Sequence, residues 1–183
     1  MVAVFGTMVA DALHIQLGIP YAVSTIGFAI AVAVVFVAWR RTEGTLSIHS
    51  IVTPRRELFY WAAVLATFAL GTAWGDLTAY TFKLGFLGAG FLFTAVFAIP
   101  GIARLAGLNS VVAFWFAYII TRPLGASFAD WIGVPASLGG LNWGRGTVSL
   151  LFTGAIVVFV AYLSLSRVDV AGVRQGSSVA EPA

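Results

Sequence analysis

The chain has 183 residues, of which 60% are hydrophobic and only 9% are charged, and its mean hydropathy is +0.98. A soluble domain carries roughly 25% charged residues, so this composition excludes one and predicts a protein that lies in a lipid bilayer. The net charge of +3 gives no reason to expect a nucleic-acid partner, and the absence of cysteine excludes disulfides, thiolate metal sites and cysteine nucleophiles.

The first predicted element is the apolar segment 1–13, which contains Asp11. A helix needs about 20 apolar residues to cross a hydrocarbon core of roughly 30 Å. This segment is therefore too short to cross alone, and we interpret it as the end of a helix. The alternative is a signal peptide cleaved near Ala10-Asp11-Ala12, but no basic residue precedes the apolar run as that interpretation requires.

Five later segments are long and apolar enough to be transmembrane helices. They are predicted at 20–39, 58–80, 84–103, 109–131 and 146–166. Only the second and fourth contain ionisable residues, namely Asp76, Arg122 and Asp130. We therefore expect an all-α, polytopic transmembrane helical bundle formed by residues 1–166, followed by a disordered tail at 167–183 that is polar and rich in small residues.

Basic residues gather on one side of the predicted membrane. Seven lie there, at Arg40, Arg41, Arg55, Arg56, Arg104, Arg167 and Arg174, mostly in the loop 40–57. Only Lys83 and Arg145 lie on the opposite side. Short loops rich in Lys and Arg stay in the cytoplasm, so the loop 40–57 and the C-terminus are predicted to be cytoplasmic.

One pattern occurs three times along the chain: glycine, a small residue, two variable residues, a small residue and aspartate. The copies end at Asp11, Asp76 and Asp130, and each is followed by a loop and an uncharged span. Trp61 and Trp115 each precede their aspartate by fifteen residues. The chain is therefore predicted to be a tandem array of two-span repeats, at about 1–39, 58–103 and 109–166.

Each repeat contains an even number of spans, so all copies have the same orientation and the three aspartates lie at one depth. The first copy has only ten residues before Asp11 and lacks the tryptophan position. Either upstream sequence is missing, or another chain completes this helix.

Ionisable residues within spans cost about 2.5–3.5 kcal/mol each on insertion and are functional candidates for that reason. Asp11, Asp76, Asp130 and Arg122 form this set, and three carboxylates near one axis would suit a small cation or a proton relay. The alternative is that each carboxylate braces its own hairpin. Neighbouring small or kink-forming residues would let the helices approach closely around the site: Gly71, Thr72, Gly75, Pro123, Gly125 and Ser127.

Arg122 lies near the middle of its span and is followed by Pro123. A buried guanidinium needs a partner, so we expect a structural ion pair with Asp130, Asp76 or Asp11. The alternative is a functional arginine, which would compete with a transported cation or bind an anionic substrate.

No catalytic motif is present, and nothing in the sequence indicates an enzyme or a cofactor. His14 and His49 are isolated, without the clustered spacing of metal sites. Polar and apolar residues alternate over 43–51, which favours an extended segment on the membrane interface.

Three strings resemble a known family: TLSIHSI at 45–51, ALGT at 69–72 and above all TRPLGAS at 121–127, followed by Asp130. They resemble an uncharacterised bacterial multi-pass membrane-protein family built from tandem two-span repeats of unknown function, and the resemblance covers about residues 1–166. It implies a location in the bacterial inner membrane. Members of that family usually have four repeats, which implies that this chain is short at its N-terminus. The family has no assigned biochemical role.

The leading hypothesis is a membrane protein that binds, and transports, a small cation or small solute at the site of Asp11, Asp76, Asp130 and Arg122. The alternative is a non-transporting scaffold or assembly protein whose buried charges are structural. The expected partners are the lipid bilayer and the small cation or solute, and the incomplete first repeat is compatible with a homo-oligomer.

Overall fold

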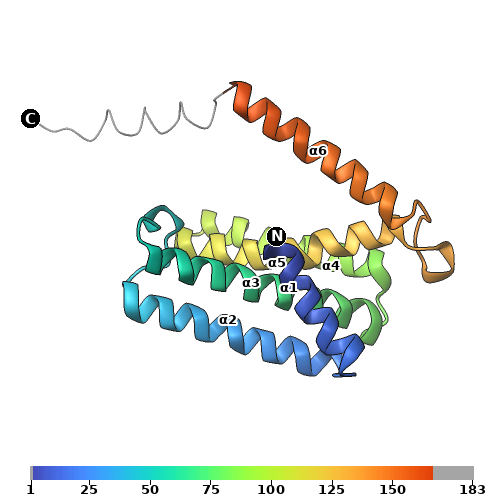
Figure 1. Ribbon diagram of the computed structural model, residues 1–183, viewed down its shortest axis with the longest axis horizontal. Coiled ribbons are helices and arrows are strands. Elements are labelled where there is room, and N and C mark those ends of the chain that lie inside the picture. Colours follow the sequence, from blue (N-terminus) through green and yellow to red (C-terminus); the bar gives the residue numbers. More distant parts are fainter. Residues whose placement is uncertain (1, 167–183) are drawn as a thin grey trace, which may run out of the picture.

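The computed structural model describes residues 2–166, and every regular element in that part of the chain is helical. The tail predicted at 167–183 lies outside the described residues. Six α-helices follow one another (Figure 1): α1 Val2–Asp11, α2 Tyr21–Glu43, α3 Pro54–Asp76, α4 Gly85–Leu105, α5 Ser110–Gly133 and α6 Arg145–Ser166. Two π-helices, Ala12–Gln16 and Leu77–Thr81, and two 3₁₀ turns, Ile48–Ser50 and Ala136–Leu138, lie in the connections. The all-α prediction is confirmed.

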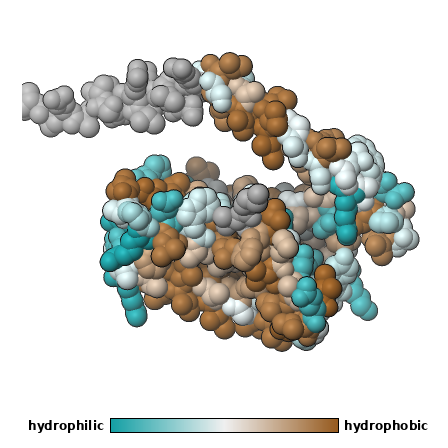
Figure 2. Space-filling view, viewed as in Figure 1, coloured by the Kyte–Doolittle hydropathy of each residue, from teal (hydrophilic) through white to brown (hydrophobic). Residues whose placement is uncertain are grey.

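Five of these helices, α2 to α6, are long and apolar enough to cross a membrane. They correspond one to one with the five predicted spans, and α1 is the short helix expected at the N-terminus. Figure 2 shows hydrophobic surface across the middle of the bundle and hydrophilic surface near its two ends, with α6 also largely hydrophobic. This is the pattern expected for helices that traverse a hydrocarbon core.

Local sequence signals fix where the long helices begin and end. Thr53 caps α3 by accepting a hydrogen bond from the Arg56 backbone N–H, and Pro54 occupies the first helical position, where no donor is needed. Asn109 caps α5 by accepting from the backbone N–H of Val111 at 2.9 Å. Gly44 ends α2 with a positive φ of 72°, a conformation that glycine adopts without strain.

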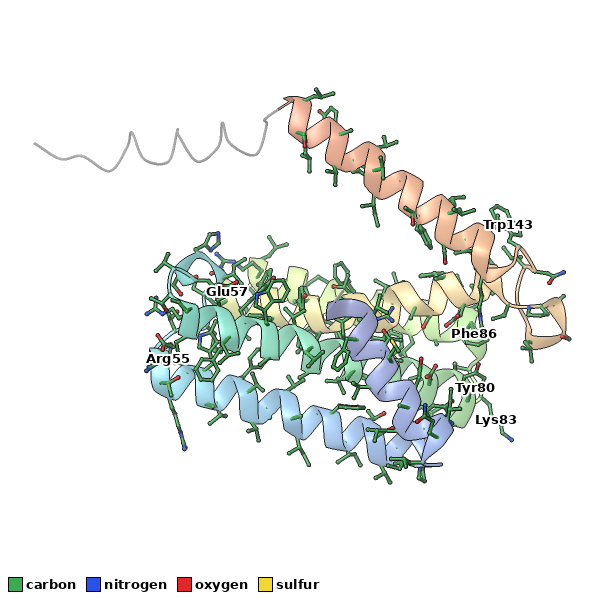
Figure 3. All side chains as sticks on the ribbon, in the orientation of Figure 1. Arg55, Glu57, Tyr80, Lys83, Phe86 and Trp143 are labelled. Carbon is green, nitrogen blue, oxygen red and sulfur yellow. The ribbon has the colours of Figure 1, made fainter. Side chains whose placement is uncertain are left out.

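The bundle has two chemically different ends. Figure 3 labels Arg55 and Glu57 near one of them and Tyr80, Lys83 and Phe86 near the other. We call the end that carries Arg40, Arg41, Arg55, Arg56 and Arg104 the arginine-rich end, and the end that carries Asp11, Asp76 and Asp130 the aspartate end. At the arginine-rich end, Glu43 accepts from Arg55 Nε at 2.5 Å and from Arg56 Nε at 2.8 Å. These are the only ion pairs between residues 2 and 166, and they close the loop that joins α2 to α3.

The loop of residues 44–53 does not form the continuous extended segment that the alternation over 43–51 predicted. Ile48–Ser50 is instead a 3₁₀ turn. Ser50 Oγ donates to the Ser47 carbonyl at 2.7 Å, and Thr45 Oγ1 accepts from the Ser47 N–H at 3.1 Å. Such local hydroxyl bonds compete with extended backbone and turn the chain.

The repeats pack in a regular order. The first helices of the three repeats, α1, α3 and α5, lie side by side with α3 between the other two. The second helix of each repeat packs on the first helix of the next, so that α2 lies on α3 and α4 lies on α5. The second helix of the third repeat, α6, has no following repeat in this chain to pack on, and it projects away from the bundle (Figure 1).

Three apolar clusters of described residues hold these helices together, one of them formed by Ala79, Phe86 and Val134. Near the arginine-rich end, Trp39, Ala63 and Trp115 are buried against one another, and Trp115 Nε1 donates to the Leu46 carbonyl at 2.9 Å. Closer to the aspartate end, α4 and α5 share the cluster of Ala89, Phe93 and Ile120. The core therefore joins different repeats, and it also joins the two helices of the second repeat, where Trp74 of α3 meets Phe93 of α4 edge to face.

Candidate functional site

The three aspartates of the repeat pattern line one cavity at the aspartate end of the bundle. Its volume is about 390 Å³, and its walls come from α1, α3 and α5, the segments that follow α1 and α3, and the starts of α2, α4 and α6. Asp11, Asp76 and Asp130 are each half-buried. The structure therefore brings the three predicted carboxylates together at the same cavity.

The backbone after the first two aspartates changes in the same way. Asp11 ends α1 and is followed by the π-helix Ala12–Gln16, while Asp76 ends α3 and is followed by the π-helix Leu77–Thr81. In the third repeat α5 continues past Asp130 to Gly133 without this change. Single π-helical turns of this kind occur frequently at functional sites.

Arg122 crosses from α5 toward the other two first helices. Its Nη2 donates to Thr7 Oγ1 on α1 at 2.6 Å, and its guanidinium carbon lies 5.6 Å from the centre of the Phe68 ring on α3. The expected ion pair with an aspartate is wrong for the part of the chain that the structure describes, where both ion pairs involve Glu43. A hydroxyl and an aromatic face contact the guanidinium instead, at distances typical of a charge-assisted hydrogen bond and a cation–π contact, while Arg122 Nε is buried with no hydrogen-bond partner among the described residues.

Glycines at equivalent positions set the spacing between the first helices. A Cβ on Gly6 would lie 2.8 Å from Phe68 Cβ, and a Cβ on Gly71 would lie 2.6 Å from Arg122 Cγ. Phe68 and Arg122 both precede their own aspartate by eight residues, so the same contact occurs between the first and second repeats and between the second and third. Gly125 is the exception, because a Cβ there would meet nothing within 4 Å. The expectation that Gly125 serves close helix approach is therefore wrong within this structure.

The remaining predicted residues lie in or beside the cavity. Thr72, Gly75 and Ser127 line it, and the Thr72 hydroxyl lies 3.5 Å from the Thr7 hydroxyl. Pro123 is buried inside α5, where Gly75 of α3 faces it. Five of the six supporting residues thus contribute to the cavity wall or to the helix contact behind it.

Aromatic rings form a row along one wall of the cavity. His14 stacks on Tyr21 with ring centres 3.4 Å apart, and Tyr21 stacks on Tyr80 with centres 5.9 Å apart. Tyr80 in turn meets Phe86 edge to face at 5.5 Å. The Nδ1 of His14 donates to the Ile19 carbonyl at 2.8 Å, which fixes the ring at the start of this row.

The cavity carries charges of both signs with a carboxylate excess. Three carboxylates line it, together with two guanidinium groups, those of Arg122 and Arg145. Between residues 2 and 166, no three His, Asp or Glu side chains are grouped closely enough to hold one metal ion. The arrangement can therefore bind a small polar molecule at several points, with formal charge that favours a positive group.

Sequence reasoning missed several residues of this wall, among them His14, Tyr21, Tyr80 and Arg145. A signal was present for two of them, because His14 follows Asp11 by three residues and Tyr80 follows Asp76 by four. Residues three or four apart on a helical segment share one face, so a ring one turn beyond each aspartate points to the same cavity. Tyr21 and Arg145 are the first residues of α2 and α6, and no pattern in the sequence connects them to the aspartates.

Tandem pairs of helices, most of them long and apolar enough to span a bilayer, define a multi-pass membrane protein built from repeats. The family described as Repeat of Unknown Function (DUF347) matches three segments, residues 1–45, 59–106 and 113–169, and the chain belongs to this family. The three matched segments overlap the repeats predicted at about 1–39, 58–103 and 109–166. No match was found among curated proteins or among solved structures.

Proposed function

We propose that this protein binds a small, positively charged organic solute in the cavity at the aspartate end and transports it across the membrane. The observation that carries the proposal is that all three repeats direct their one intramembrane aspartate to the same cavity. Carboxylates are costly inside a membrane, and parallel repeats that meet at a polar site are a common plan of transporters. The proposed role is binding and transport, with no catalytic step and no cofactor.

An organic ammonium group suits this cavity better than a bare metal ion. A volume of about 390 Å³ falls within the range of pockets for small molecules and exceeds what a single ion needs. The stacked rings of His14, Tyr21 and Tyr80 offer an aromatic wall beside the carboxylates. Aromatic faces combined with negative charge are a recurrent way to recognise ammonium groups. Arg122 and Arg145 would accept a carboxylate if the solute were a zwitterion.

The proposal includes a location and an orientation. We place the protein in the bacterial cytoplasmic membrane, with the arginine-rich end in the cytoplasm and the cavity toward the outer face. The support is the uneven distribution of basic residues, since Arg40, Arg41, Arg55 and Arg56 lie at one end and only Lys83 and Arg145 at the other.

A structural scaffold is the second candidate function, and one observation favours it. Arg122 links α5 to α1 through Thr7 and to α3 through Phe68, so this charge also holds the three repeats together. In a scaffold, the aspartates would matter for stability alone and no solute would bind.

A ligand-dependent thermal unfolding assay on the detergent-purified protein separates the two functions. The panel contains methylammonium, ethanolamine, choline, the zwitterion glycine betaine, Mg²⁺ and Mn²⁺. A solute that binds only the folded state adds about 2.7 kcal/mol of stability at a hundred times its dissociation constant. We expect an organic cation to raise the melting temperature of the wild type and to have no effect on the Asp76→Asn, Asp130→Asn double variant.

Glu57→Gln is the matched control, because it removes a carboxylate at the other end of the bundle, where Glu57 Oε1 accepts from Trp61 Nε1 at 3.2 Å. This variant should keep the full shift. If only a metal ion shifts the wild type, the organic-solute proposal is wrong. If no compound shifts it and the double variant is simply less stable, the scaffold function replaces transport.

A further inference from the structure

Equivalent residues of the three repeats are buried to different extents, depending on whether the repeat has a neighbouring repeat on both sides or on one side only. In the second repeat, Gly71 and the face formed by Ala69, Leu70 and Ala73 are all buried. This middle repeat has a neighbour on both sides. The two flanking repeats each have one face covered and one face bare.

The bare face of the first repeat lies on α1. Val4, Phe5 and Met8 stand seven, six and three residues before Asp11, the positions that Ala69, Leu70 and Ala73 hold before Asp76. Their exposed fractions are 61%, 59% and 61%, whereas the three residues of α3 are 3–6% exposed. In α5 the equivalent residue of Phe5 is Leu124, which packs on the cluster of Phe93 from α4. This bare face of α1 therefore corresponds to the faces of α3 and α5 on which α2 and α4 pack.

The helix α6 carries the matching bare face. Val32, Phe93 and Ile156 each lie thirteen residues before the end of their matched repeat, and Trp39, Pro100 and Leu163 each lie six before it. Val32 and Phe93 are 5% and 0% exposed, while Ile156 is 63% exposed. Trp39 and Pro100 are likewise buried and Leu163 is 45% exposed. The positions that α2 and α4 bury against the first helix of the next repeat are therefore exposed in α6.

A tryptophan pair supports the same conclusion at the other end of the bundle. Trp115 is 4% exposed because Phe36 and Trp39 of α2 pack against it, but the equivalent Trp61 is 44% exposed. Trp61 lines an apolar groove of about 670 Å³ together with Val4, Phe5 and Met8. One helix placed along this groove would cover both α1 and Trp61, as α2 covers both α3 and Trp115.

We propose that α6 of a second copy of this chain occupies this groove, so that two copies exchange their last helices. In α6, the residues at the positions that α2 and α4 use to contact a first helix are uncovered. This helix also projects away from its own bundle (Figure 1). Its direction fits, because α6 runs from the aspartate end toward the other end as α2 and α4 do, antiparallel to α1. Lipid covers exposed apolar side chains equally well, so the inference depends on the repeat register and not on hydrophobicity. Exchange of an identical element between copies is an inexpensive route to a dimer.

Cysteine cross-linking tests this contact without background, since the sequence contains no cysteine. Phe5→Cys and Ile156→Cys are placed on separate copies that carry tags of different size, and both are co-expressed and oxidised in native membranes. The pair is equivalent to Leu124 and Phe93, which share one cluster. We expect a product with both tags at twice the chain mass, and none when either variant is expressed alone.

Val158→Cys is the matched control for Ile156→Cys, because it is 68% exposed on the same helix and its equivalents Val34 and Ala95 are exposed too. It should give several-fold less cross-link with Phe5→Cys. Equal yields, or no product with both tags, would overturn the proposal. The chain that carries both Phe5→Cys and Ile156→Cys must also form dimers, and a cross-linked monomer instead would mean that α6 closes on its own bundle.

Discussion

Arg122 is the residue whose environment differs most from what its sequence context predicts. Its guanidinium donates to Thr7 and lies over Phe68, with no carboxylate of the described chain in ion-pair distance. Asp11, Asp76 and Asp130 are therefore left without a salt-bridge partner among residues 2–166. Half-buried carboxylates in this state are available to bind a cationic group, which is why the proposed function is assigned to them and not to the arginine.

Gly71→Ala should destabilise the protein by about 1–3 kcal/mol, the usual cost of overpacking. The added Cβ would lie 2.6 Å from Arg122 Cγ and 2.7 Å from Arg122 Cβ, both near the backbone of α5, so the side chain cannot simply rotate away. The measurement is the midpoint of thermal unfolding in detergent.

Gly125→Ala is the control at the equivalent position of the third repeat, where a Cβ would meet nothing within 4 Å. It should leave the midpoint unchanged or raise it slightly, because alanine favours a helix over glycine by about 1 kcal/mol. Equal losses in both variants would contradict the assignment of Gly71 to a close helix contact.

At the scale of elements, hydropathy and repeat spacing are enough to predict the helices. The span predicted at 84–103 is α4 Gly85–Leu105, and the span predicted at 146–166 is α6 Arg145–Ser166. Helix length and apolar composition are set by the bilayer, so they are written directly in the sequence. The three-fold aspartate pattern likewise predicts one common site.

Other features of the elements were not predictable, for physical reasons. The ring row of His14, Tyr21 and Tyr80 depends on π-helical turns and on the entry of α2. The partner of Arg122 depends on which first helices lie next to one another. Periodicity specifies what a helix buries but not which helix covers it. The spacing can place His14 and Tyr80 near the aspartates, but neither their stacking with Tyr21 nor the partner of Arg122 can be derived from one sequence.

Trp115→Phe should lower stability by about 1–3 kcal/mol, whereas Trp61→Phe should change it little, although both occupy the same position in their repeats. Trp115 is 4% exposed and its Nε1 donates to the Leu46 carbonyl, which would lose its donor. Trp61 is 44% exposed and bonds only the exposed Glu57. Thermal unfolding of the two variants at equal detergent concentration is the comparison, and equal losses would show that the covering of Trp115 by α2 and its loop is not as described.

At the scale of the whole molecule, the parallel repeats give the bundle an arginine-rich end and an aspartate end. Every repeat contains an even number of helices, so each aspartate returns to the same side. The orientation proposed above for the chain in the membrane rests on this charge asymmetry. In the proposed function, this arrangement makes the site open to one aqueous compartment, as the resting state of an alternating-access transporter is.

The orientation is tested with single cysteines and a membrane-impermeant maleimide on intact cells. His49→Cys lies in the loop at the arginine-rich end, and Leu138→Cys lies in the loop after α5, at the other end, where Leu138 is 58% exposed. We expect Leu138→Cys to react in intact cells and His49→Cys to react only after the membrane is permeabilised. The opposite result would place the cavity toward the cytoplasm.

The central claim is that the three aspartates form a transport site, and solute flux into proteoliposomes tests it most directly. The solute is the organic cation that gives the largest thermal shift, and the proteins are the wild type, Asp76→Asn and the control Glu57→Gln. The account predicts that Asp76→Asn lowers initial uptake at least about tenfold, equal to about 1.4 kcal/mol, while the folded fraction is preserved and Glu57→Gln remains near wild type. Uptake by Asp76→Asn at the wild-type rate, or no uptake above empty vesicles by the folded wild type, would contradict it.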